Sequence, residues 1–68
     1  MWTKEQIQAW CKERATLPHR ITDNTDSFTR YVWEDGSTYA FCWLSYTVRR
    51  KVYRVEIDGA AVFEGVSE

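Results

Sequence analysis

The side chains best suited to nucleophilic or acid–base chemistry in this 68-residue chain are Cys11, Cys42 and His19. A catalytic thiol needs a base beside it and a third group that orients the base. His19 is the only histidine, and it follows Pro18 in a polar segment. Cys11 falls among apolar residues at helical spacing, where a buried thiol is inert. The pattern therefore predicts a protein that is not an enzyme and has no catalytic residues.

Two pairs of acidic residues, Asp23 with Asp26 and Glu34 with Asp35, are the next candidates for a chemical site. Both pairs lie in polar segments whose composition is typical of solvated turns. Neither pair belongs to the ligand pattern of a calcium-binding loop. A single histidine and the lack of Cys-x-x-Cys spacing exclude the common zinc ligand sets. We therefore expect no metal and no cofactor.

The composition restricts the protein class further. A chain of 68 residues predicts a single domain, residues 1–68. Its 44% hydrophobic and 16% aromatic content and net charge of −1 exclude a disordered chain and argue against a dedicated duplex-DNA binder. No apolar run reaches the roughly 18 residues of a membrane span, and no signal-peptide pattern is present, so we expect a cytoplasmic protein without a membrane partner. The sequence leaves open whether its two cysteines are bridged.

The N-terminal residues predict an amphipathic helix over about residues 3–16. Thr3 and Gln6 have the spacing of a capping box, which marks a helix start. Pro18 ends the helix, because the residue before a proline avoids the α conformation. The apolar residues of this segment fall on one stripe of the helix: Ile7, Trp10, Cys11 and Ala15.

After a polar connection over residues 17–27, the apolar residues alternate with a period of two. This pattern predicts four strands: residues 28–33, 38–48, 52–57 and 60–66. Asp35-Gly36 and Asp58-Gly59 are strong hairpin signals. The expected fold is α+β, with one N-terminal amphipathic helix packed on a four-stranded antiparallel β-meander. The sequence leaves open whether residues 19–23 form an extra strand.

Two-residue turns in all three hairpins would sort the side chains into two faces. The face expected under the helix is nearly all apolar: Tyr31, Trp33, Ala40, Cys42, Leu44, Tyr46, Tyr53, Val55, Ile57, Ala60 and Val62. The other face would combine aromatic side chains with arginines, and we take it as the predicted partner-binding surface: Arg30, Tyr39, Phe41, Trp43 and Arg54. A bulged hairpin would exchange the two faces of a strand, so the face that the helix covers stays open.

Function is expected at that surface and at the turn after the second predicted strand, where Arg49, Arg50 and Lys51 form a basic tip. Aromatic and arginine side chains are enriched at interface hot spots. The sequence therefore predicts a protein-interaction module, an inhibitor or adaptor that occludes a protein partner or binds itself as a homodimer. In size and composition it resembles small accessory proteins of phages and mobile elements. The alternatives are single-stranded nucleic-acid binding by the same face and tip, or a structural subunit of a larger assembly; no small-molecule substrate is evident.

Overall fold

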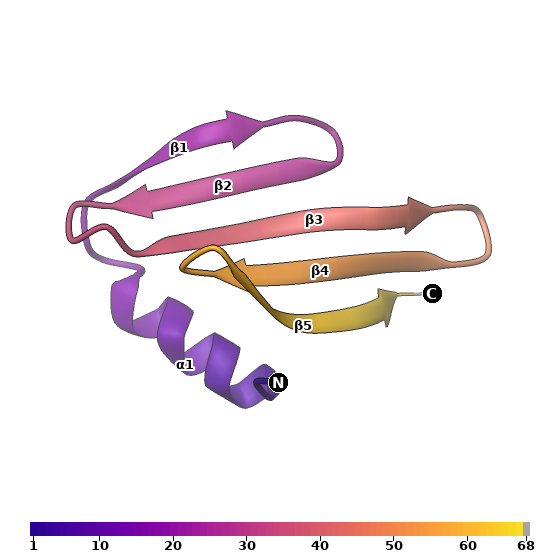
Figure 1. Cartoon of the computed structure of the whole chain (residues 1–68), viewed down its shortest axis with the longest axis horizontal. Coiled ribbons are helices and arrows are strands. Elements are labelled where there is room, and N and C mark those ends of the chain that lie inside the picture. Colours follow the sequence, from indigo (N-terminus) through magenta and orange to yellow (C-terminus); the bar gives the residue numbers. More distant parts are fainter. Residues whose placement is uncertain (68) are drawn as a thin grey trace.

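The computed structural model describes residues 1–67 and contains one helix and a five-stranded antiparallel sheet (Figure 1). The strands lie in the sheet in their sequence order, from β1 to β5. The element bounds are Lys4–Arg14 for α1, His19–Asn24 for β1, Phe28–Trp33 for β2, Thr38–Tyr46 for β3, Lys51–Ile57 for β4 and Ala60–Ser67 for β5. The predicted α+β class with an antiparallel sheet is confirmed. The predicted number of four strands is wrong by one.

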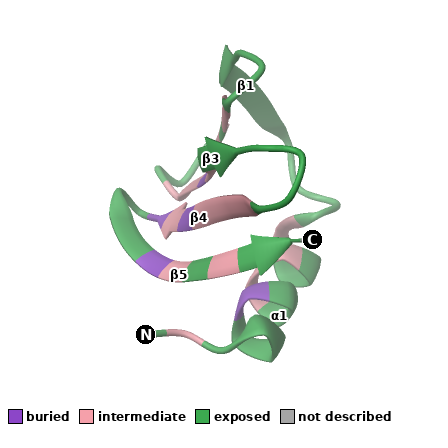
Figure 2. Ribbon diagram, turned by 90° about the vertical axis from the view of Figure 1, so that its right-hand side faces the viewer, coloured by how far each residue is buried: buried purple, intermediate pink, exposed green. Residues whose placement is uncertain are grey.

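The additional strand is β1, which lies at one edge of the sheet and pairs only with β2. All six of its residues are exposed, as the green ribbon in Figure 2 shows. Its sequence, His-Arg-Ile-Thr-Asp-Asn, has no apolar alternation because neither of its faces packs into a core. Backbone pairing alone defines this strand, and it carries a bulge between Ile21 and Asp23. A hydrophobic pattern therefore could not have revealed it.

The capping box at the start of α1 is present. The Thr3 hydroxyl accepts the Gln6 backbone N–H at 3.1 Å, and the Thr3 N–H donates to Gln6 Oε1 at 2.8 Å. These bonds satisfy N–H groups at the start of the helix that have no partner inside it. At the other end of α1, the Trp33 Nε1–H of β2 donates to the Arg14 carbonyl at 3.0 Å. The helix is therefore attached to the sheet at its C-terminal turn. No helix within residues 1–67 is long and apolar enough to cross a membrane.

The β2–β3 hairpin corrects the predicted side-chain faces. Its loop has three residues, 34–36, instead of the two expected, and Gly36 takes a left-handed φ of 88°. A three-residue hairpin loop uses that conformation to close a bulge. Tyr31 consequently lies opposite Tyr39 and not opposite Ala40. A slip of one residue moves the side chains of a strand to the other face, so the expected faces of β3 are exchanged from Thr38 to Trp43.

The remaining hairpins complete this arrangement. A bulge in β3 near Leu44 leaves Trp43 opposite Tyr53. Asp58 and Gly59 form the expected two-residue turn, with φ values of 54° and 83°, and a second bulge follows in β5. The helix-side face of the sheet therefore includes Tyr39, Phe41 and Trp43 as well as Tyr53, Val55 and Ile57. Ala40 and Cys42, which were expected under the helix, lie on the opposite face.

The core forms where α1 packs on β4 and β5. Its buried members are Ile7, Val55, Ile57 and Val62. The N-terminal segment also joins the sheet, because the Trp2 N–H donates to the Val62 carbonyl at 2.9 Å. Seven partly buried side chains surround this cluster: Trp2, Trp10, Cys11, Tyr39, Phe41, Tyr53 and Phe63.

Candidate functional site

The helix is too short to cover the whole face on which it packs. Eleven residues of α-helix span about 16 Å, at 1.5 Å for each residue. Nine residues of β3 span about 30 Å, at roughly 3.3 Å for each residue. Figure 1 shows the β3–β4 hairpin extending well beyond the N-terminal end of α1. One half of the helix-side face is therefore left without a covering element.

The uncovered half carries a continuous group of aromatic rings. Phe41 stacks on Tyr53 with ring centroids 5.1 Å apart, and Trp43 meets Phe41 edge-on at 5.1 Å. Tyr46 extends the group toward the hairpin end at 5.3 Å from Trp43, and Phe63 of β5 lies 6.1 Å from Tyr53. Edge-to-face and offset-stacked pairs at these separations are the favoured aromatic geometries. We call these five residues the aromatic shelf.

A glycine on β5 makes room for the centre of the aromatic shelf. Gly65 lies opposite Tyr53 in the β4–β5 pair. A Cβ atom at Gly65 would lie 2.5 Å from both Cζ and Oη of Tyr53 and 2.9 Å from Phe63 Cε1. These separations are shorter than van der Waals contact. The tyrosine ring can therefore lie over β5 only because position 65 has no side chain.

A groove of about 340 Å³ runs between α1 and the sheet, and three members of the aromatic shelf, Phe41, Tyr53 and Phe63, form part of its floor. Its floor consists of apolar and aromatic side chains of the sheet: Tyr39, Phe41, Tyr53, Val55 and Phe63. Its wall is the first half of the helix: Lys4, Ile7 and Gln8. Among the described residues that line it, Lys4 is the one charged side chain.

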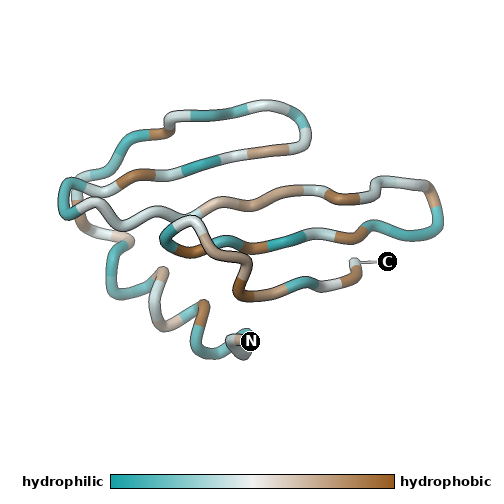
Figure 3. The backbone as a smooth tube through the Cα atoms, viewed as in Figure 1, coloured by the Kyte–Doolittle hydropathy of each residue, from teal (hydrophilic) through white to brown (hydrophobic). Residues whose placement is uncertain are grey.

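The basic tip lies at the outer end of the aromatic shelf. Thr47 and Arg50 close the turn. The Thr47 backbone N–H donates to the Arg50 carbonyl at 2.9 Å, and the Thr47 hydroxyl donates to the same carbonyl at 2.8 Å. The Lys51 ammonium lies 4.8 Å from the centre of the Tyr46 ring, within cation–π range. Figure 3 shows hydrophilic positions where the β3–β4 turn leads into β4, after a hydrophobic position in the turn itself. The ion pairs within residues 1–67 use Arg14, Arg30 and Arg54 and none of the tip residues.

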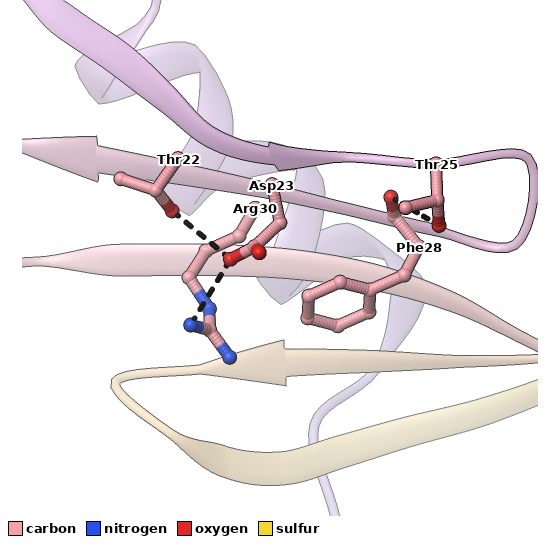
Figure 4. A network of polar contacts seen from close by, with 5 residues as sticks. All are labelled: Thr22, Asp23, Thr25, Phe28 and Arg30. Atoms are coloured by element: carbon pink, nitrogen blue, oxygen red, sulfur yellow. Dashed lines mark hydrogen bonds and ion pairs between the residues drawn. The ribbon is translucent and has the colours of Figure 1, made fainter.

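Arg30 and Arg54 lie on the opposite face of the sheet from the aromatic shelf. Arg30 pairs with Asp23 of β1 at 3.3 Å, within the polar network drawn in Figure 4. Arg54 lies 3.6 Å from both Glu56 and Glu64. These partly exposed ion pairs balance the charges on a solvated face.

The predicted partner-binding residues are therefore divided between two surfaces. Phe41 and Trp43 lie together beside the basic tip, and Tyr39 lies farther along the same face, where its ring stacks on Trp10 at 6.3 Å. The two arginines do not join them. Three shelf members, Tyr46, Tyr53 and Phe63, were not among the predicted residues. The bulge in β3 between Trp43 and Ser45 brings the first two to the face of Trp43, and apolar alternation does not reveal it.

The remaining reactive side chains lie apart from the aromatic shelf. Burial raises the pKa of the Cys11 thiol, which packs beside the core. Cys42, also a free thiol, lies on the opposite face. His19 is exposed, with its ring 5.7 Å from Tyr31 and 5.4 Å from Trp33. Within residues 1–67, no three His, Cys, Asp or Glu side chains gather as a metal site would require.

Comparison of the chain with protein-family models, with curated proteins and with solved structures found no match.

Proposed function

We propose that this chain is a non-enzymatic protein-interaction module, an inhibitor or adaptor that binds its partner through the aromatic shelf. The observation that carries the proposal is the extent of the aromatic face beyond the end of α1. Contiguous exposed apolar patches on small proteins mark interaction sites. Aromatic side chains supply much of the binding energy at such sites, because they bury a large area with few rotatable bonds.

The exposed surface of the isolated chain supports this proposal. A folded monomer of 8.1 kDa typically exposes about 4,500 Å². The surface of this chain is 5075 Å². No side chain among the described residues has less than 2% of its surface exposed, and six hydrophobic residues among them are classed as buried. A partner on the aromatic shelf would remove part of this surface from water.

A second candidate function, single-stranded nucleic-acid binding, is favoured by one contact, that of Lys51 with the Tyr46 ring. Such proteins combine a basic groove with rings that stack on bases. The arginines expected to contact phosphates, however, lie on the opposite face and are paired with carboxylates. Protein binding is therefore the function that the geometry supports better.

The proposal is tested by selecting binders from a random 12-residue peptide-display library. Selected clones are then measured against the wild type and against Trp43→Ala, Tyr46→Ala and Phe28→Ala. Phe28 is the matched control, because it is an aromatic residue of the opposite face. We expect clones that bind the wild type and Phe28→Ala equally, and that bind Trp43→Ala at least tenfold more weakly. Tyr46 is 66% exposed, so we expect Tyr46→Ala to retain the fold. This variant therefore tests the aromatic shelf even where Trp43→Ala does not fold.

Two outcomes would contradict the proposal. One is a selection that yields no clone sensitive to the shelf substitutions. The other is that no peptide is selected but the wild type retains a 20-nucleotide oligo(dT), and Trp43→Ala loses this binding. Light scattering after size exclusion, over a wide range of concentration, shows whether a second copy covers the aromatic shelf. A stable mass near twice 8.1 kDa that Trp43→Ala reduces to the monomer identifies the partner as this chain itself.

A further inference from the structure

We infer that the segment bound by the aromatic shelf and its groove is an acidic peptide segment, in which Asp or Glu residues flank large apolar side chains. This inference rests on the proposed function and specifies the chemistry of the partner. It follows from where the charged groups lie around the apolar floor.

The charges that border the site are positive on two sides. Lys4 lies in the helix wall of the groove. Lys51 lies against the Tyr46 ring at the outer end of the aromatic shelf, and Arg49 and Arg50 precede it in the β3–β4 turn. The described residues that line the groove include no carboxylate. A bound segment would therefore meet cations on both borders.

The acidic residues of the sheet lie elsewhere. Glu56 and Glu64 are on the opposite face, where they pair with Arg54. Glu34 and Asp35 are in the β2–β3 loop, and Asp58 is in the β4–β5 turn, at the end of the sheet away from the basic tip. Although the net charge of the chain is −1, the charged residues that border the interaction face are therefore basic. A complementary partner carries negative charge, which would steer it to this face.

The distribution of the cations favours a peptide over a nucleic acid. A single-stranded nucleic acid carries one phosphate for each nucleotide and needs cations along its whole path. Here the floor between Lys4 and the basic tip is formed by uncharged side chains over the width of the groove. A peptide can place apolar side chains on that floor and carboxylates only at its two borders.

The sequences of the selected clones test this inference directly. We expect clones that depend on the aromatic shelf to contain more Asp and Glu than the unselected library and fewer Lys and Arg. The most enriched clone, made as a fluorescent peptide, is then titrated by anisotropy. We expect the double variant Lys4→Glu, Lys51→Glu to bind it at least tenfold more weakly at low salt. High salt reduces the difference between this variant and the wild type, because ions screen exposed charges.

The matched control is the double variant Lys12→Glu, Arg20→Glu, which makes the same change in net charge at exposed sites outside the groove. It should bind like the wild type. Shelf-dependent clones without an excess of acidic residues would overturn this inference and leave the proposed function standing, as would equal weakening by the two double variants. A selection without shelf-dependent clones would overturn both. Circular dichroism of each variant checks that the sheet is retained.

Discussion

The helix-side face of the sheet has two halves that differ in what covers them. In one half, α1 packs on Val55, Ile57 and Val62, which retain 4%, 4% and 9% of their surface exposed. In the other half, the outer part of the aromatic shelf has no covering element: Trp43 is half-buried and Tyr46 is 66% exposed. Both halves contain aromatic residues. The length of α1, rather than the composition of the strands, therefore determines which residues stabilise the fold and which stay available.

The contacts of the aromatic rings show the same difference. Trp10 of α1 meets Trp33 edge-on at 5.4 Å and stacks near Tyr39, so in the covered half the rings join helix to sheet. In the aromatic shelf, Trp43 and Tyr46 meet rings of β3 and β4 at similar distances, whereas Phe41, Tyr53 and Phe63 also pack against the core cluster. Trp43 and Tyr46 therefore contribute mainly cross-strand contacts, each worth about 0.2–1 kcal/mol.

The largest expected effect contrasts one truncation in each half. Ile57→Ala should lower the free energy of unfolding by about 2–5 kcal/mol, because it leaves a cavity in the buried cluster. A core of this size rarely supplies more than about 3–5 kcal/mol, so this variant should be largely unfolded at room temperature. Tyr46→Ala should change the same quantity by only about 0.5 kcal/mol. Urea denaturation followed by circular dichroism measures both, and equal losses would show that the two halves do not differ as described.

A smaller effect is expected from Gly65→Ala, which perturbs the aromatic shelf without removing a ring. The new methyl group must displace the Tyr53 ring or the Phe63 ring, at a cost of about 1–3 kcal/mol. Because the atoms it meets in Tyr53 belong to the far end of that side chain, Tyr53→Ala in the same chain should recover part of the loss. Urea midpoints of the two single variants and the double variant give this coupling. Additive effects would contradict the close approach of the ring to β5.

The smallest expected effect is the pH dependence of the covered half. Burial raises the pKa of the Cys11 thiol. Burial is also the largest cause of the raised pKa of the Tyr39 hydroxyl. The unfolded chain therefore loses these protons at a lower pH than the folded chain does. The contribution of these two groups to the free energy of unfolding is fully present below the ordinary pKa of a thiol. It declines as the pH rises through the raised pKa values of Cys11 and Tyr39 in the folded chain. Urea midpoints between pH 8 and pH 11 should fall, and the double variant Cys11→Ala, Tyr39→Phe should show a shallower fall.

The part of the fold that follows local rules could be predicted from the sequence. The capping box of Thr3 and Gln6 and the turn at Asp58-Gly59 are present as expected, because each depends on a few neighbouring residues. The β1 strand could not be predicted, because its residues face solvent and leave no periodic pattern. The side-chain faces of β3 could not be fixed either. A loop of two residues and a loop of three residues both suit Asp35-Gly36, and the choice exchanges the faces.

The candidate site could be predicted only in part for the same reason. Phe41 and Trp43 were expected on a binding surface, and both lie on the aromatic shelf. Their expected arginine neighbours, Arg30 and Arg54, were placed there by an assumed register. The three-residue β2–β3 loop overturns it for Arg30, and the bulge in β3 overturns it for Arg54. The basic tip stands next to the aromatic rings irrespective of register, since Lys51 directly follows the β3–β4 turn.

The position of α1 on β4 and β5 has a consequence for the order in which the chain folds. Ile7 and Trp2 take their sheet contacts from residues such as Val55 and Val62, about fifty positions later in the sequence. The strand pairs, in contrast, join neighbours across short turns. Closing the longest loop costs the most chain entropy, so we expect the helix to dock on β4 and β5 after the strands have paired. During synthesis, Ile7 cannot reach its buried partners until β4 and β5 have been made, whereas the contacts of Trp10 with Trp33 and Tyr39 can form earlier.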